Sequence, residues 1–173
     1  MIWKRLLRTA ALSAASLLVL SLQMFTVNPL EIFISNVLVN AILFVIVLTG
    51  ALSESIVCAV VIAFFTKYFG IIDGYVLPDT IITYVLTVFF TYRLRATRFY
   101  WVTVIATLTF FISRLIGRTV AFAAVKIGEI SPVALTTAFR DTLDNCAKDY
   151  RMPLFGILLA MAIIWLYKKW REQ

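Results

Sequence analysis

The chain has 173 residues, of which 62% are hydrophobic and only 14% are charged, and its mean hydropathy is +0.97. A soluble domain is usually about half apolar and about a quarter charged, so this composition predicts an all-α membrane protein, and the net charge of +7 follows apolar spans instead of forming a nucleic-acid-binding patch. The sequence has no histidine, two cysteines, and no nucleophile-elbow, phosphate-loop or paired-carboxylate motif, so we expect no enzyme, no metal site and no cofactor.

Three apolar segments in the first half of the chain have the length of a membrane span, about 17 to 25 residues. They cover about residues 9–27, 28–50 and 55–72. The first follows three basic residues and also fits a cleaved signal peptide, but its cleavage site is poor, and we favour a membrane span. The second has a clear start, because Asn28 can cap the helix, Pro29 suits its first position, and Glu31 can reach back to the Asn28 amide.

Three further spans follow in the second half of the chain. They cover about residues 78–93, 100–125 and 152–167. The fifth span is apolar except for Arg114 and Arg118. Between the fifth and sixth spans lies a more polar stretch, residues 128–151, in which Ser131 and Pro132 are expected to start a short helix, either interfacial or an extension of the sixth span. Its apolar face would carry one residue per turn: Leu135, Phe139 and Leu143.

The orientation follows from the distribution of charge over this six-span topology. One side, with both termini and the loops after the second and fourth spans, holds nine of the sixteen lysines and arginines and two acidic residues. The other side holds seven basic and seven acidic residues. The positive-inside rule therefore predicts six transmembrane helices in one domain, residues 1–173, with both termini in the cytoplasm (N-in/C-in) of a multi-pass cell-membrane protein.

The first span carries a strip of small residues. Ala10 and Ala14 are four residues apart, as are Ala11 and Ala15, so they form a flat face that another helix can approach closely. This alanine strip either packs on the protein's own helices, the interpretation that the sequence alone favours, or binds a partner reached from the cytoplasmic side.

Polar side chains gather in the outer half of the predicted bundle. On the fifth span Thr103, Thr107, Arg114 and Arg118 fall within about 60° of one another on one helix face. Two buried arginines need acidic partners or a polar cavity, because an arginine at the membrane centre costs about 2.5 to 3.5 kcal/mol on insertion scales.

Companions for these arginines lie at the same depth on two other spans: Asn36, Asn40, Asp79, Thr80, Thr83 and Tyr84. One interpretation is a structural network in which Asp79 pairs with an arginine and the asparagines bridge helices. The other is a ligand pocket open to the outside. Both fit the sequence, since ionisable groups inside a membrane mark functional sites and also hold helices together.

The chain resembles the substrate-binding S components of energy-coupling factor (ECF) importers of vitamins and micronutrients. Three features carry the resemblance. They are the alanine strip, the segment Leu38-Val39-Asn40-Ala41-Ile42-Leu43, and the run from Gly50 to Ile72, in which Gly50 follows a threonine and the last six residues are Lys-Tyr-Phe-Gly-Ile-Ile. The resemblance covers most of the chain. Ser53-Glu54-Ser55 departs from the glycines and proline that are common there in the family.

The resemblance implies a compact six-helix bundle that captures a small molecule from outside and hands it to a transmembrane coupling subunit driven by cytoplasmic ATPases. On this sequence Ala10, Ala11, Ala14 and Ala15 would form the docking face. Asp79, Tyr84, Arg114 and Arg118 would belong to the pocket. Two arginines suit a ligand with a carboxylate or phosphate, because guanidinium groups bind such oxygens bidentately.

Two other classes of protein remain as alternatives. A structural scaffold similar to the rod-shape-determining membrane protein of bacterial cell-wall machinery is also small, six-spanning and basic. A membrane-bound enzyme is the least favoured, because the sequence lacks histidine and metal-ligand motifs.

Overall fold

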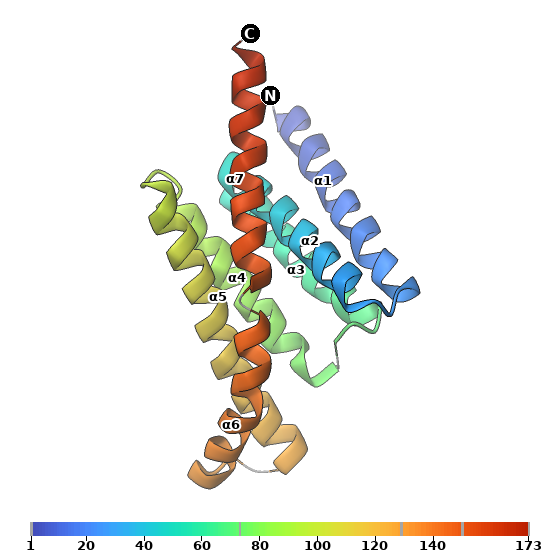
Figure 1. Ribbon diagram of the computed structural model, residues 1–173, viewed down its shortest axis with the longest axis vertical. Helices are drawn as coiled ribbons and strands as arrows, with labels where there is room; N and C mark the ends of the chain where they lie inside the picture. The colour runs from blue at the N-terminus through green and yellow to red at the C-terminus, as the bar shows by residue number, and fades with distance from the viewer. Residues whose placement is uncertain (1, 73, 129, 150, 173) are drawn as a thin grey trace.

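The computed structural model describes residues 2–72, 74–128, 130–149 and 151–172, and these residues form helices and short connections without a strand (Figure 1). The α-helices are α1 (Ile2–Leu22), α2 (Pro29–Thr49), α3 (Leu52–Tyr68), α4 (Leu77–Leu94), α5 (Phe99–Phe122), α6 (Pro132–Asp149) and α7 (Arg151–Arg171). Short 3₁₀ turns, η1 (Gln23–Phe25) and η2 (Gly74–Val76), precede α2 and α4, and a π-helical turn, η3 (Ala123–Ile127), ends α5.

Four stretches of the described chain are long and apolar enough to cross a membrane, as expected of a multi-pass membrane protein. They are Leu6–Phe25, Pro29–Thr49, Tyr100–Val125 and Arg151–Arg171. Two of the six predicted spans, those that correspond to α3 and α4, are not among these four. The start of α1 and the end of α7 lie at the same end of the molecule, here called the termini end, and α6 lies at the opposite end (Figure 1).

The predicted start of the second span is confirmed by the cap of α2. The Asn28 side chain accepts a hydrogen bond from the Leu30 amide at 3.0 Å, and Pro29 takes the first helical position. Glu31 accepts hydrogen bonds from the side chains of Asn28 and Thr26. It does not accept from the backbone N–H of Asn28, so this part of the expected cap was wrong.

Two helix boundaries differ from the spans drawn on the sequence. The third helix begins at Leu52, before the predicted start at residue 55, because Glu54 lies in its first turn and accepts from the Ala51 amide at 3.4 Å. It ends at Tyr68, because Gly70 takes a left-handed conformation (φ +72°) that favours glycine. The helix is therefore displaced by about one turn toward the N-terminus relative to the predicted span.

The core of the bundle lies where α2 meets the helices on either side. One cluster joins α1, α2, α3 and α4 around Leu20, Leu43, Ile62 and Val88. A second joins α2, α5 and α7 around Phe44, Val102, Ala106, Ile157 and Ala160. On the four long apolar stretches the exposed residues are mostly apolar, which suits contact with lipid.

Side chains from two neighbouring segments hold the α2–α3 turn at the termini end. Arg8 of α1 donates to the carbonyl oxygen of Thr49 at 3.1 Å, and Arg95 donates to that of Gly50 at 2.8 Å. Thr9 of α1 donates to Glu54 at 3.2 Å. Carbonyls at the end of α2 that lack helical partners are thus satisfied by basic side chains.

Helix α6 packs along the far end of α5. Its buried face carries Ala134, Ala138 and Thr142, and the Thr142 hydroxyl lies 3.0 Å from that of Thr119 on α5. The residues predicted for the apolar face of this helix flank the contact: Leu135 packs beside the alanines, while Phe139 is 45% exposed and Leu143 36%. Small alanines allow closer approach to α5 than leucine would, and the three large residues remain beside this contact.

We predict that Thr142→Val loosens α6 from α5, because valine keeps the shape and removes one buried hydrogen bond worth about 1 kcal/mol. Hydrogen exchange of the backbone amides in residues 132–149 should accelerate about fivefold. Thr137→Val is the control, since Thr137 is exposed and bonds only its own helix at Val133. Equal exchange in the two variants would contradict an anchoring role for Thr142.

Candidate functional site

A cavity of about 320 Å³ opens in the half of the bundle away from the termini. Its walls come from the first half of α2, the end of α3 with the following loop, the start of α4, the second half of α5 and the start of α7. The lining residues are Asn36, Asn40, Thr66, Ile71, Ile72, Thr80, Tyr84, Phe110, Arg114, Arg118 and Met152. Its volume is at the lower end of the range for small-molecule sites, about 300 to 1,000 Å³.

Six of the seven residues predicted for the ligand site line this cavity: Asn36, Asn40, Thr80, Tyr84, Arg114 and Arg118. The seventh, Asp79, is 5% exposed and lies behind the wall, at the crossing of α4 and α5. The structure therefore brings together side chains from three spans that the sequence placed only at a common depth.

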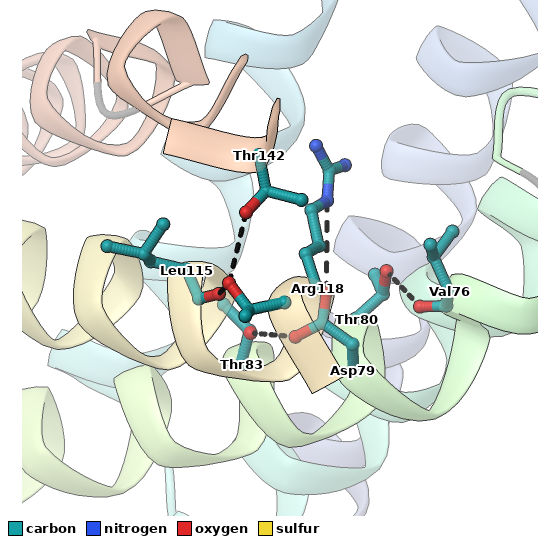
Figure 2. A network of polar contacts seen from close by, with 8 residues as sticks. Val76, Asp79, Thr80, Thr83, Leu115, Arg118 and Thr142 are labelled. Atoms are coloured by element: carbon teal, nitrogen blue, oxygen red, sulfur yellow. Dashed lines mark hydrogen bonds and ion pairs between the residues drawn. The ribbon is translucent and has the colours of Figure 1, made fainter. Parts of the chain in front are cut away.

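The arginines stand one turn apart on α5 and are both partly buried. Nε of Arg118 forms an ion pair with Oδ2 of Asp79 across 3.8 Å (Figure 2). The Arg114 guanidinium lies 5.5 Å from the centre of the Phe110 ring, a cation–π contact, and also within electrostatic reach of Asp79. The wall of the cavity on α5 is thus cationic, and Asp79, which lies behind it, balances part of this charge.

Asp79 is held from two helices at once. Thr83, one turn along α4, donates to Oδ1 at 3.3 Å, and Arg118 approaches Oδ2 from α5 (Figure 2). The carboxylate fits only because residue 117 of α5 is glycine: a Cβ there would lie 2.7 Å from Cγ of Asp79 and would overlap Oδ1. Gly117 therefore sets how closely α5 approaches α4 beneath the cavity.

The structural interpretation of the polar groups is correct for Asp79 and wrong for the asparagines. Asn36 donates to the carbonyl of Ile32 at 3.0 Å, and Asn40 donates to the carbonyl of Asn36 at 2.8 Å, so both amide nitrogens bond their own helix and do not bridge to another. The amide oxygens remain as the acceptors that these residues can offer a ligand.

A second glycine brings α7 against α2 beside the cavity. A Cβ on Gly156 would lie 2.6 Å from Cβ of Asn40 and 3.1 Å from the backbone nitrogen of Ala41. Asn40 is 3% exposed because of this close approach. The start of α7, which brings Met152 to the cavity, is positioned by this contact.

The remaining wall is aromatic and aliphatic, and sequence analysis missed most of it. Tyr84 meets Phe110 edge to face with ring centres 5.8 Å apart. Phe110, Ile71, Ile72 and Met152 carry no polar signal, and they reach the cavity only through the fold. Thr66 was missed as well, since its hydroxyl bonds its own helix and threonines are frequent in these segments.

Two threonines predicted on the arginine face of α5 do not line the cavity. The Thr103 hydroxyl lies 3.9 Å from the Met161 sulfur on α7, and Thr107 lies one turn further along α5. Both stand on the termini side of Phe110, so the polar face of α5 is longer than the cavity.

The alanine strip lies on the surface of α1. Ala10, Ala11 and Ala14 are exposed and Ala15 is half-buried, while Ser16 and Leu20 make the buried contacts of this helix. The sequence alone favoured packing of the alanine strip on the protein's other helices, but α1 makes these contacts with a different face.

Neither a metal site nor a reactive cysteine stands out among the described residues. No group of three or more histidine, cysteine, aspartate or glutamate side chains there could hold a metal ion. Cys58 is a buried thiol that accepts from the Ser13 hydroxyl at 3.2 Å. The side chain of Cys146 lies outside the described residues.

Comparison of the chain with models of known protein families, with curated proteins and with solved structures finds no match. The geometry of the cavity and its charges therefore carry the functional argument.

We predict that Gly117→Ala destabilises the protein by about 1 to 3 kcal/mol, because the new methyl group overlaps the Asp79 carboxylate and forces the two helices apart. Thermal unfolding in detergent measures the effect. In an Asp79→Ala background the same substitution should cost at least about 1 kcal/mol less, because Oδ1 and Cγ are gone and only the Cβ of residue 79, 3.1 Å from the new methyl group, remains. Equal costs in the two backgrounds would refute the assigned contact.

Proposed function

We propose that the protein crosses the cell membrane six times, through α1, α2, α3, α4, α5 and α7. Helices α3 and α4 have 17 and 18 residues. At 1.5 Å per residue they are about 26 and 27 Å long, close to the thickness of a bilayer core. An even number of crossings agrees with the shared end of α1 and α7 (Figure 1). The basic residues at this end favour its placement in the cytoplasm.

We infer that the protein captures a small molecule from outside the cell for import. The observation that carries this inference is the cavity of about 320 Å³ in the half opposite the basic termini, lined by two arginines, two asparagines and an aromatic pair. Ligand sites are typically concave and mostly apolar, with a few convergent polar groups, and this cavity has that composition. A structural scaffold needs no such cavity.

The ligand that fits best carries a carboxylate or phosphate and a small planar or apolar body. Arg114 and Arg118 supply charge-assisted donors, and Asn36, Asn40 and Thr80 supply further polar groups. Tyr84, Phe110 and the isoleucines offer a surface for the apolar part. Vitamins and their precursors include molecules of this size and character.

Delivery into the cell would need a partner, and the exposed alanine strip supports the S-component interpretation. In this proposal a transmembrane coupling subunit docks on Ala10, Ala11 and Ala14, and its ATPases supply the driving force. Small residues suit such docking, because helix association inside a membrane depends on close backbone approach.

We predict that purified protein binds an anionic vitamin or precursor and that Arg114→Gln weakens this binding about tenfold or more, since one charge-assisted hydrogen bond is lost. A native mass spectrometry or thermal-shift screen against a vitamin panel finds the ligand, and a titration measures the change. Arg118 is the poorer choice for substitution, because its loss also leaves Asp79 without its ion-pair partner.

The matched control for this test is Arg140→Gln, which removes an exposed arginine from α6 in the same half of the molecule. Its affinity should equal that of the parent protein. Failure of the whole panel to bind, or equal affinity of Arg114→Gln and the parent, would reject the cavity as a capture site.

We predict that Ala10→Leu combined with Ala14→Leu reduces co-purification with a co-expressed coupling subunit and its ATPases about tenfold, since two bulky side chains then hold the partner helix away. Ala162→Leu is the control, because Ala162 is an exposed alanine of α7. Co-purification of cell-wall elongation proteins in place of the coupling subunit would favour the scaffold.

A further inference from the structure

A larger groove than the ligand cavity lies at the termini end, between α1, α2 and α7. It encloses about 880 Å³, and we call it the basic groove. Its lining residues are Arg8, Leu12, Val45, Thr49, Ile163, Ile164, Tyr167, Lys168, Arg171 and Glu172. None of them contributes to the ligand cavity, so the basic groove is a separate feature of the protein.

The rim of the basic groove is cationic. Three of its side chains are basic, Arg8, Lys168 and Arg171, against one acidic side chain, Glu172. Arg8 is fixed by its hydrogen bond to the carbonyl of Thr49, 3.1 Å away, so its charge stays at the end of α2. The rim therefore favours an anion.

The floor of the basic groove is apolar. The floor residues are each four residues, or about 6 Å of helix, further into the bundle than a residue of the rim. Leu12 follows Arg8 on α1, Val45 precedes Thr49 on α2, and Ile164 precedes Lys168 on α7. A soluble anion bound at the rim would leave this floor in contact with water. An occupant that fills the whole groove needs a negative head and an apolar tail.

The rim also lies at the depth where lipid headgroups are expected. Arg8 is near the start of the first membrane-spanning stretch, and Lys168 and Arg171 are near the end of the last. Trp165 and Trp170 of α7 are 61% and 73% exposed at the same level, and tryptophan is enriched where a bilayer meets water. Basic pockets between transmembrane helices on the cytoplasmic side bind anionic lipid headgroups.

We propose that the basic groove binds one anionic phospholipid, with its phosphate at Arg8, Lys168 and Arg171 and an acyl chain along the floor between α1 and α7. Charge complementarity at the rim and the depth of the apolar floor together select this occupant over a soluble phosphate. A helix of a partner protein is the competing occupant, and it fits less well, because the groove is cationic only at its rim and apolar along its floor. The proposal is independent of the ligand cavity.

Native mass spectrometry of protein delipidated in a neutral detergent tests the proposal. Phosphatidylglycerol should bind about tenfold or more tightly than phosphatidylcholine with the same acyl chains, and glycerol phosphate should not bind. The triple variant Arg8→Gln, Lys168→Gln, Arg171→Gln should lose this preference. The control triple variant Lys4→Gln, Arg93→Gln, Arg98→Gln removes the same charge near the same end, outside the groove, and should keep it.

Two single substitutions keep the test decisive if the triple variant does not fold. Glu172→Gln removes the acidic side chain of the rim and should strengthen phosphatidylglycerol binding about threefold. Ile164→Trp fills the floor and should weaken binding of both lipids. Equal binding of the two lipids by the parent protein, loss of preference in the control, or no response to Glu172→Gln and Ile164→Trp would overturn the proposal.

Discussion

The contact between Asp79 of α4 and Arg118 of α5 is the constraint on which the functional half of the molecule depends. Each charge alone would be costly in a bilayer, and the approach of Arg118 Nε to Asp79 Oδ2 at 3.8 Å offsets part of both costs. The carboxylate reaches this position only over Gly117, so the ion pair fixes the register and the separation of α4 and α5 together. Arg114, one turn further along α5, is thereby placed in the cavity wall.

The cavity is the space between two tightly packed helix pairs. Asp79 and Gly117 hold α5 on α4, while Asn40 and Gly156 hold α7 on α2. Both contacts depend on a missing side chain, and both lie beside the cavity. The pairs share the core around Phe44 and Val102 nearer the termini. The same four helices, α2, α4, α5 and α7, therefore surround the cavity in one half of the molecule and pack closely in the half nearer the termini.

Sequence reasoning went furthest where one residue type has one physical meaning. Apolar runs predicted a membrane protein, Asn28 and Pro29 predicted the start of α2, and the depth of Arg114, Asn40 and Thr80 grouped residues that do line one cavity. It could not reach what tertiary packing decides: Asp79 lies behind the wall, α6 buries small alanines, and Phe110 and Met152 look like ordinary lipid-facing residues. The six crossings and the likeness to S components remain predictions.

The two charged regions of the protein differ in what balances them. At the termini end the basic side chains are exposed and exceed the acidic ones, so the bilayer surface and water must supply the counter-charge. In the opposite half Asp79 neutralises Arg118 inside the protein. Two arginines on one membrane-spanning helix would be costly to bury without an acidic partner, and a carboxylate beside them lowers that cost. Asp79, which lies behind the cavity wall, therefore both positions Arg118 and lowers the cost of burying it.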